Sequence, residues 1–242
     1  MSSITINIKP DGTAISLPID YHHILQAVVY DLMRDGTTDA SLHDTGCLFG
    51  NRAYKLFTFG PPTGIFHRAG NKIVFDDMFS FEVRMWDKQL TDLIRGNIAD
   101  RGIRFGSEIY RNVTCSTATN RIESDDIIIS MQSPICLYTT DPLTHHTHYI
   151  RPGDPEFGPA VSHNFNRKYA AATGFEPDSE ISLSVIDVRP GDKYVTRYKN
   201  FIIEGYKGTY RLKGKPEYLS FLYDTGLGAK NAQGFGMFRV IE

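Results

Sequence analysis

Glycines near the end of the 242-residue chain form a pattern that suits phosphate binding. Residues 226–236 read G-L-G-A-K-N-A-Q-G-F-G, so two Gly-apolar-Gly pairs flank a lysine. Glycine permits positive φ and close backbone approach, and successive amide N–H groups in such a loop can form a concavity for phosphate oxygens. The alternative is a mobile loop before the last strand. We expect phosphate contacts from Gly226, Gly228, Lys230, Asn231, Gln233, Gly234 and Gly236.

This stretch differs from two common phosphate-binding motifs. No Gly-Lys-Ser/Thr follows the glycines, which excludes a nucleotide P-loop. A dinucleotide fingerprint joins a first strand to a helix, whereas this stretch joins an expected helix to an expected final strand. The chain also lacks the carboxylate pattern of a metal-dependent nucleotide enzyme. A nucleotide-utilising enzyme is therefore the weakest of three function classes.

A basic segment precedes the glycine-rich stretch. Residues 189–215 contain eight basic and two acidic side chains, a local balance of +6 (8 − 2), although the whole chain has a formal net charge of −2. The alternatives are a solvated hairpin and a track that follows a phosphate backbone. We favour the track, with contacts from Arg197, Lys199, Arg211 and Lys213.

Composition indicates a soluble globular protein. Hydrophobic residues make up 41% and charged residues 22% of the chain, and no apolar run reaches the roughly 18 residues that span a membrane. The sequence shows no signal peptide pattern, and the three scattered cysteines favour a reducing cytosol. His145, His146 and His148 fit a polar loop better than a metal site, because no carboxylate or cysteine stands at ligand spacing. We therefore expect a cytoplasmic protein without metal, cofactor or membrane contact.

The apolar pattern predicts the order β-α-β-β-α-β twice. The first set comprises strands at 4–8, 54–59, 73–75, 79–85 and 103–113, with helices at 21–34, capped by Asp20, and 87–100. Residues 114–125 are polar and fit a connection. The second set comprises strands at 126–137, 181–188, 194–213 and 237–241, a loop at 141–154, and helices within 155–172 and at 216–223. The prediction is an α+β chain of two tandem ferredoxin-like (RRM-like) domains, 1–122 and 123–242.

With these elements in place, the whole chain resembles the CRISPR-associated endoribonucleases that cut precursor crRNA within its repeats, a branch of the RAMP superfamily. The glycine-rich loop of residues 226–236, followed by Met237 and a terminal strand, is the most specific match. Further similarity lies in Tyr21-His22-His23 with Val29-Tyr30, in Leu42-His43-Asp44, in residues 55–59 and in Ser133-Pro134-Ile135. The resemblance implies tandem ferredoxin-like domains and a CRISPR repeat RNA as partner in a prokaryotic cytoplasm. It also allows contacts with effector-complex subunits, and it leaves open a monomer or a homodimer.

The resemblance also implies metal-independent cleavage. The 2′-hydroxyl attacks the adjacent phosphate and leaves a 2′,3′-cyclic phosphate and a 5′-hydroxyl. By position, the family's tyrosine, histidine and lysine correspond to Tyr30, His43 and Lys55. Such a trio suits the reaction, which needs a base, an acid and a cation for the phosphorane. His22 and His23 are rivals for the histidine role, and the acid and base roles of Tyr30 and the histidine stay open.

Two further functions remain as alternatives to this endoribonuclease. A non-cleaving subunit that binds crRNA in an interference complex would share both the fold and the glycine-rich loop. It would bind repeat RNA without cutting it, and His43→Ala would leave that binding unchanged. The nucleotide-utilising enzyme would instead bind ATP.

Overall fold

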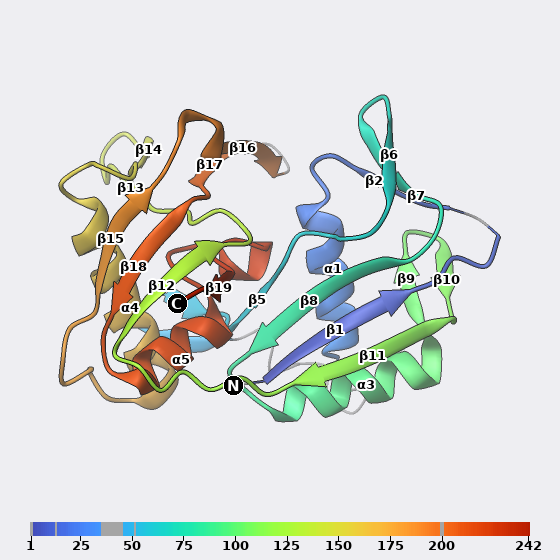
Figure 1. The fold of residues 1–242 in the computed structure, drawn as a ribbon, viewed down its shortest axis with the longest axis horizontal. Coiled ribbons are helices and arrows are strands. Elements are labelled where there is room, and N and C mark those ends of the chain that lie inside the picture. Colours follow the sequence, from blue (N-terminus) through green and yellow to red (C-terminus); the bar gives the residue numbers. More distant parts are fainter. Residues whose placement is uncertain (1, 13, 35–45, 51, 199–200) are drawn as a thin grey trace.

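Two four-stranded antiparallel sheets stand side by side in the computed structural model (Figure 1). The structure describes residues 2–12, 14–34, 46–50, 52–198 and 201–242. The first sheet has the strand order β11-β1-β8-β5, and the second has the order β15-β18-β12-β19. Each sheet carries two helices in a β-α-β-β-α-β sequence, which confirms the predicted α+β, tandem ferredoxin-like fold.

The first unit is built on an alternating strand. Its elements are β1 (Ser2–Ile8), α1 (His22–Leu32), β5 (Phe57–Phe59), β8 (Phe79–Met85), α3 (Gln89–Arg101) and β11 (Val113–Ala118). In β1, Ile4, Ile6 and Ile8 are fully buried, and the apolar stripe of α1 joins the same core. Because side chains alternate across a strand, these isoleucines share one face and bring α1 onto it.

Three small sheets extend the first unit. They contain β2 (Ile15–Pro18) with β6 (Phe66–Ala69) and β7 (Lys72–Phe75), then β3 (Cys47–Phe49) with β4 (Arg52–Tyr54), and β9 (Ile103–Phe105) with β10 (Glu108–Tyr110). The strand expected at residues 103–113 is therefore a hairpin, which turns at Gly106 with φ +60°.

The fourth strand of the first sheet lies where the sequence suggested a connection. β11 pairs with β1 along its whole length, from Val113 opposite Ile8 to Ala118 opposite Ser3. Most of its residues are exposed because β11 is the edge strand. An edge strand carries polar side chains, so its pattern resembles that of a linker. The predicted domain boundary at residue 122 falls between β11 and β12 and remains a proposal.

Two local expectations in the first unit were wrong. α1 begins after Tyr21 without a side-chain cap, so Asp20 does not cap it. The strand expected at residues 54–59 is interrupted, because Lys55 and Leu56 lie between β4 and β5. This interruption places Lys55 in a short connection outside the sheets.

The second unit repeats the arrangement with two added hairpins. Its main elements are β12 (Asp126–Met131), α4 (Phe157–Thr173), β15 (Ser182–Asp187), β18 (Thr209–Lys213), α5 (Pro216–Thr225) and β19 (Phe238–Val240). The hairpins are β13 (Tyr138–Thr140) with β14 (Thr147–Tyr149), and β16 (Lys193–Tyr198) with β17 (Phe201–Tyr206). The expected loop at 141–154 thus contains a strand, and the β16–β17 hairpin stands between the two sheets, near α1 (Figure 1).

The two units meet through a buried cation. Arg84 of β8 is 2% exposed, donates to the Phe238 carbonyl of β19 at 2.5 Å and pairs with Glu82 at 2.7 Å. Its guanidinium carbon lies 3.7 Å from the centre of the Tyr223 ring. Because a buried charge is costly unless it is paired, these contacts fix the relative position of the two sheets.

Candidate functional site

The glycine-rich loop needs glycine at all four positions. Gly226, Gly228, Gly234 and Gly236 have φ values of +82°, +68°, +82° and +81°. A Cβ on Gly236 would lie 2.0 Å from the Leu227 carbonyl oxygen. The positive φ values and the lack of space together exclude larger side chains. The sequence-based expectation of unusual backbone at these positions is confirmed.

Asn231 holds the two glycine pairs together. It is 6% exposed, and its Nδ2 donates to the Leu227 carbonyl at 3.0 Å and to the Phe235 carbonyl at 3.1 Å. A Cβ on either Gly226 or Gly236 would lie 2.6 Å from this Nδ2. The glycines therefore make room for a buried amide that bonds both arms of the loop.

Lys168 of α4 adds two further hydrogen bonds to the glycine-rich loop. Its Nζ donates to the Gly226 carbonyl and, at 3.1 Å, to Asn231 Oδ1. The side chain is 1% exposed, and burial lowers its pKa from 10.5 to about 7. No sequence pattern singles out Lys168, because the helical period alone places it among other residues of an amphipathic helix.

The glycine amides differ from the expected open concavity. The N–H groups of Gly226, Gly234 and Gly236 donate to the carbonyls of Leu222, Asn231 and Pro134 at 2.7, 2.9 and 2.9 Å. These three amides are paired within the protein and are not available to a phosphate in this conformation. The physical reason is that the loop is buried between the two units, where backbone polar groups must find partners.

The two units contribute facing side chains to one cavity of about 180 Å³, which we call the loop pocket. Tyr30 and Gln26 come from α1 and Lys55 from the connection after β4, while Lys230 and Gln233 come from the glycine-rich loop. Tyr30 packs edge-on against Phe57 at 5.5 Å. Two of the three predicted catalytic residues, Tyr30 and Lys55, thus share a pocket with the predicted binding residues Lys230, Asn231 and Gln233.

The predicted histidines lie in different places. His43 is outside the described residues; Gly46, the first described residue after that gap, lies beside Lys55. His22 is 3% exposed; its Nδ1–H donates to the Gln233 carbonyl at 2.7 Å, and its Nε2 accepts from the Tyr194 hydroxyl at 3.1 Å. Burial is the main reason that its pKa falls to about 4. His22 is therefore a neutral imidazole that holds the glycine-rich loop through the Gln233 carbonyl.

His23 occupies a separate cavity. Its Nδ1–H donates to the Asp20 carbonyl at 2.9 Å, and the ring lines a pocket together with Ala27, Asp31 and Arg104. This arrangement separates His23 from the pocket that contains Tyr30 and Lys55. His23, a rival for the role of catalytic histidine, therefore does not line the loop pocket with Tyr30 and Lys55.

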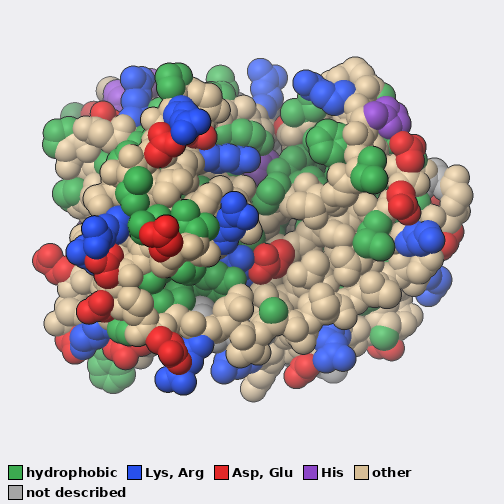
Figure 2. Space-filling model, in the orientation of Figure 1, with side chains coloured by type: hydrophobic (Ala, Val, Ile, Leu, Met, Phe, Trp, Pro, Cys, Tyr) green, Lys and Arg blue, Asp and Glu red, His purple; other side chains and the backbone are tan. Residues whose placement is uncertain are grey.

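Among the described residues, five basic side chains of residues 189–215 pair with acids, and four of these pairs use acids outside the segment. Arg211 and Lys213 share Asp126 at 2.6 and 3.0 Å. Other pairs of the same kind are Arg189 with Asp187, Lys193 with Glu204 and Lys215 with Asp178. Figure 2 shows Lys and Arg side chains interspersed with Asp and Glu over this half of the molecule. These ion pairs reduce the local excess of positive charge, and the phosphate track predicted for residues 189–215 stays a prediction.

Arg197 lies exposed on β16, and Lys199 is outside the described residues. The contacts of Arg197, Lys199, Arg211 and Lys213 with RNA remain predictions. For Arg211 and Lys213, such contacts would require phosphate oxygens to replace the carboxylate of Asp126.

Within the described ranges, no group of three or more His, Cys, Asp or Glu side chains is placed to hold a metal ion. His146 and His148 contact one another at 3.2 Å in the β13–β14 hairpin. The loop pocket is lined by the phenols of two tyrosines and by the side chains of three lysines and one arginine, namely Tyr30, Tyr54, Lys55, Lys168, Lys230 and Arg52. Such groups can orient and stabilise an anionic group such as a phosphate.

Comparison with known proteins identifies the family. Residues 117–240, about half of the chain, match the family model of the C-terminal part of CRISPR associated protein Cas6. The chain belongs to the Cas6 family. A relative described as "CRISPR-associated endoribonuclease Cas6", from Pyrococcus furiosus, is 23% identical over 94% of this chain and 84% of its own length.

Solved structures of Cas6 and RAMP proteins have the same fold. One, described as "An RAMP protein binding different RNA substrates", has a TM-score of 0.81 at 17% identity and covers 100% of both chains. Another, "CRISPR associated protein Cas6", has a TM-score of 0.76 at 19% identity, covering 100% of this chain and 99% of its own. Among the helices described for this Cas6-family chain, none is long and apolar enough to cross a membrane.

Proposed function

We propose that this protein is an endoribonuclease that cuts CRISPR repeat RNA in precursor transcripts to give mature crRNA. The reaction is attack of the 2′-hydroxyl on the adjacent phosphate, without a metal ion, and it leaves a 2′,3′-cyclic phosphate and a 5′-hydroxyl. A curated Cas6 relative is named as an endoribonuclease, and one solved Cas6 structure is titled a product complex.

One observation carries the proposal: side chains from the two units converge in the loop pocket. Tyr30 and Lys55 approach from the first unit, and Lys230 approaches from the glycine-rich loop, about 175 to 200 residues later in the chain. A phosphate held in this pocket would lie near the ammonium groups of Lys55 and Lys230 and the phenol of Tyr30. That set matches the charge that develops on the phosphorane oxygens during attack.

Each residue has a distinct role in this proposal. Lys55 and Lys230 stabilise the negative charge of the phosphorane, and Tyr30 orients the phosphate or transfers a proton. His43 precedes Gly46 by three residues in the sequence and is the proposed acid or base. The glycines shape the loop, and Lys230 and Gln233 make its RNA contacts, because the amides of Gly226, Gly234 and Gly236 are occupied.

A cleavage assay in EDTA tests this function. The substrate is the repeat RNA encoded beside the gene for the protein, and the variants are Lys55→Met, His43→Ala and His23→Ala. We expect wild-type cleavage in EDTA, strong loss in Lys55→Met and His43→Ala, and near wild-type rates in His23→Ala. Lys72→Met is a matched control, because Lys72 is an exposed lysine of β7.

Two results would contradict the proposal. Cleavage that stops in EDTA and returns with a divalent cation would overturn the metal-independent mechanism. Tight repeat binding without cleavage in any condition, unchanged in His43→Ala, would instead identify a crRNA-binding subunit of an interference complex.

A further inference from the structure

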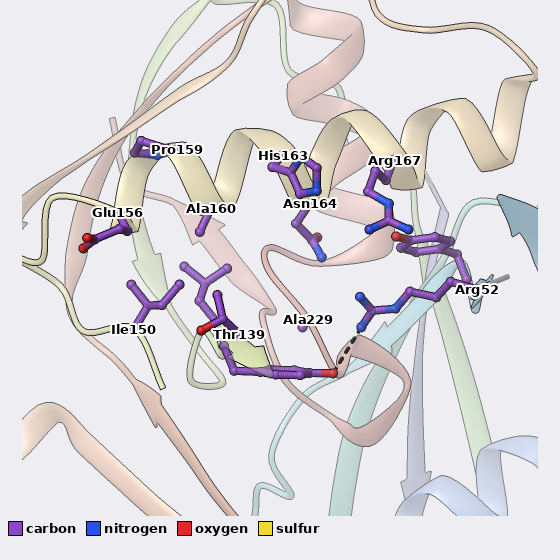
Figure 3. A pocket seen from close by; sticks show the side chains of 13 residues that line it. Arg52, Thr139, Ile150, Glu156, Pro159, Ala160, His163, Asn164, Arg167 and Ala229 are labelled. Atoms are coloured by element: carbon purple, nitrogen blue, oxygen red, sulfur yellow. Dashed lines mark hydrogen bonds between the residues drawn. The ribbon is translucent and has the colours of Figure 1, made fainter. Parts of the chain in front are cut away.

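A second cavity adjoins the loop pocket and has no role in the reaction described so far. It has a volume of about 320 Å³ and lies between α4, the end of β4 and the β13–β14 hairpin (Figure 3). We call it the α4 cavity. It shares Arg52, Tyr54, Asn164 and Ala229 with the loop pocket, so the two cavities are neighbours. A group that leaves the loop pocket on this side would enter the α4 cavity.

The α4 cavity has an apolar body and a cationic end. Ile150, Ala160 and Pro159 line the body together with Leu137. The guanidinium groups of Arg52 and Arg167 lie at one end, and Glu156 lies at the other (Figure 3). Because Arg52 also lines the loop pocket, the cationic end is the end nearest the proposed scissile phosphate. An apolar wall with polar groups placed around it is typical of sites that bind small organic groups.

Two buried polar atoms at the α4 cavity lack partners within the described part of the chain. They are Asn164 Oδ1 and the Tyr54 hydroxyl. Figure 3 shows the Asn164 side chain pointing from α4 into the cavity. A buried polar atom without a hydrogen bond is costly, so each of these two atoms needs a partner such as a water molecule or a group of a ligand. An asparagine amide can both donate to and accept from the edge of a nucleobase.

An aromatic ring lines the α4 cavity and lies near a cation of the loop pocket. Tyr138 lines the α4 cavity, while Lys230 lines the loop pocket, with its Nζ 4.9 Å from the centre of the Tyr138 ring. Arg52 fixes the ring by donating to its hydroxyl at 3.1 Å. A tyrosine held at its hydroxyl and near a cation offers a preorganised stacking surface for a base.

We propose that the α4 cavity receives one unpaired nucleobase of the RNA, next to the cleavage position. The base stacks on Tyr138, Asn164 contacts its edge, and Arg52 and Arg167 bind the phosphates that join it to the loop pocket. This inference rests on the proposed function for the identity of its ligand. It adds a site of base recognition beside the site of chemistry.

Binding of abasic RNA tests the inference. The substrates are repeat RNAs with a 2′-deoxy nucleotide that blocks cleavage, each with a single abasic nucleotide within three positions of the cut. In wild-type protein we expect one abasic position to weaken binding roughly 5- to 150-fold, the range of one base–aromatic stack. The Tyr138→Leu protein should bind intact RNA weakly, and the abasic substitution should not weaken that binding further.

Two further variants keep the test decisive if Tyr138→Leu folds poorly. Tyr138→Phe retains the ring and should keep the abasic penalty. Asn164→Leu removes the amide at similar volume and should reduce the penalty at the same nucleotide. An abasic penalty that is the same in wild-type, Tyr138→Leu and Asn164→Leu proteins at every position would overturn the inference.

The assay separates this inference from the proposed function. If wild-type protein binds repeat RNA with the expected coupling to Tyr138 but never cleaves intact RNA, the endoribonuclease proposal fails and base recognition stands. If wild-type protein cleaves but shows no coupling, base recognition fails and the endoribonuclease proposal stands.

Discussion

Replacing the buried Lys168 with methionine should change how stability depends on pH. Lys168 is 1% exposed and donates to the Gly226 carbonyl and to Asn231 Oδ1. Lys168→Met leaves both acceptors without this donor, at about 1–3 kcal/mol each, but it also removes the cost of burying an ammonium group. Because these effects oppose one another, the change in stability at a single pH does not isolate the charge.

The pH dependence of the free energy of unfolding does isolate the charge of Lys168. Burial lowers the pKa of Lys168 from 10.5 to about 7 in the folded protein. Between these values the unfolded chain binds one proton more than the folded protein, so the free energy of unfolding rises with pH. From pH 7 to pH 9 this group contributes a gain of about 2 kcal/mol in the wild type, and Lys168→Met lacks it.

Urea unfolding at pH 7, 8 and 9 measures the difference between the two proteins. Other titrating groups contribute equally to both and cancel. Lys72→Met, which replaces an exposed lysine of β7, should retain the wild-type pH dependence. Equal pH dependence in wild type and Lys168→Met would refute the conclusion that burial lowers the pKa of Lys168.

Three further predictions concern the site and its support. Lys55→Met should slow single-turnover cleavage about 10²- to 10³-fold while repeat binding changes less than about 10-fold; an unchanged rate would remove Lys55 from the chemistry. Gly236→Ala should lower the free energy of unfolding by more than about 2 kcal/mol, because its Cβ would lie 2.0 Å from the Leu227 carbonyl, whereas Gly174→Ala, at a similar φ in open space, should cost about 1 kcal/mol. Because the pKa of His22 is lowered to about 4 in the folded protein, the unfolded chain binds more protons below pH 7. Between pH 7 and pH 5, the free energy of unfolding of the wild type should therefore fall by about 2 kcal/mol relative to that of His22→Asn, as measured by urea unfolding. Parallel pH curves for the two proteins would show that the folded state protonates His22 freely.

The sequence predicted those parts of the fold that rest on local periodicity. The alternating isoleucines of β1 and the apolar stripe of α1 placed both elements correctly. It missed β11 because an edge strand with an exposed face has the polar composition of a linker. It missed the break at Lys55 because alternation continues through β4 and β5, although their hydrogen-bonding partners differ.

The site was predicted in outline and differs in its details. Positive φ at the glycines follows from residue type, but whether their amides face a ligand or the protein depends on tertiary packing. The charge balance of residues 189–215 could not reveal Asp126, which reaches Arg211 and Lys213 from a neighbouring strand. The role of Lys168 depends on contacts with residues that lie 58 and 63 positions away in the chain.

The most direct test of the central claim is cleavage of a repeat RNA with one 2′-deoxy nucleotide just upstream of the cut, in EDTA. If side chains of the loop pocket direct a ribose hydroxyl against its neighbouring phosphate, the deoxy RNA should bind normally and remain intact, while the all-ribose RNA is cut. Cutting of the deoxy RNA at the same position would contradict the account.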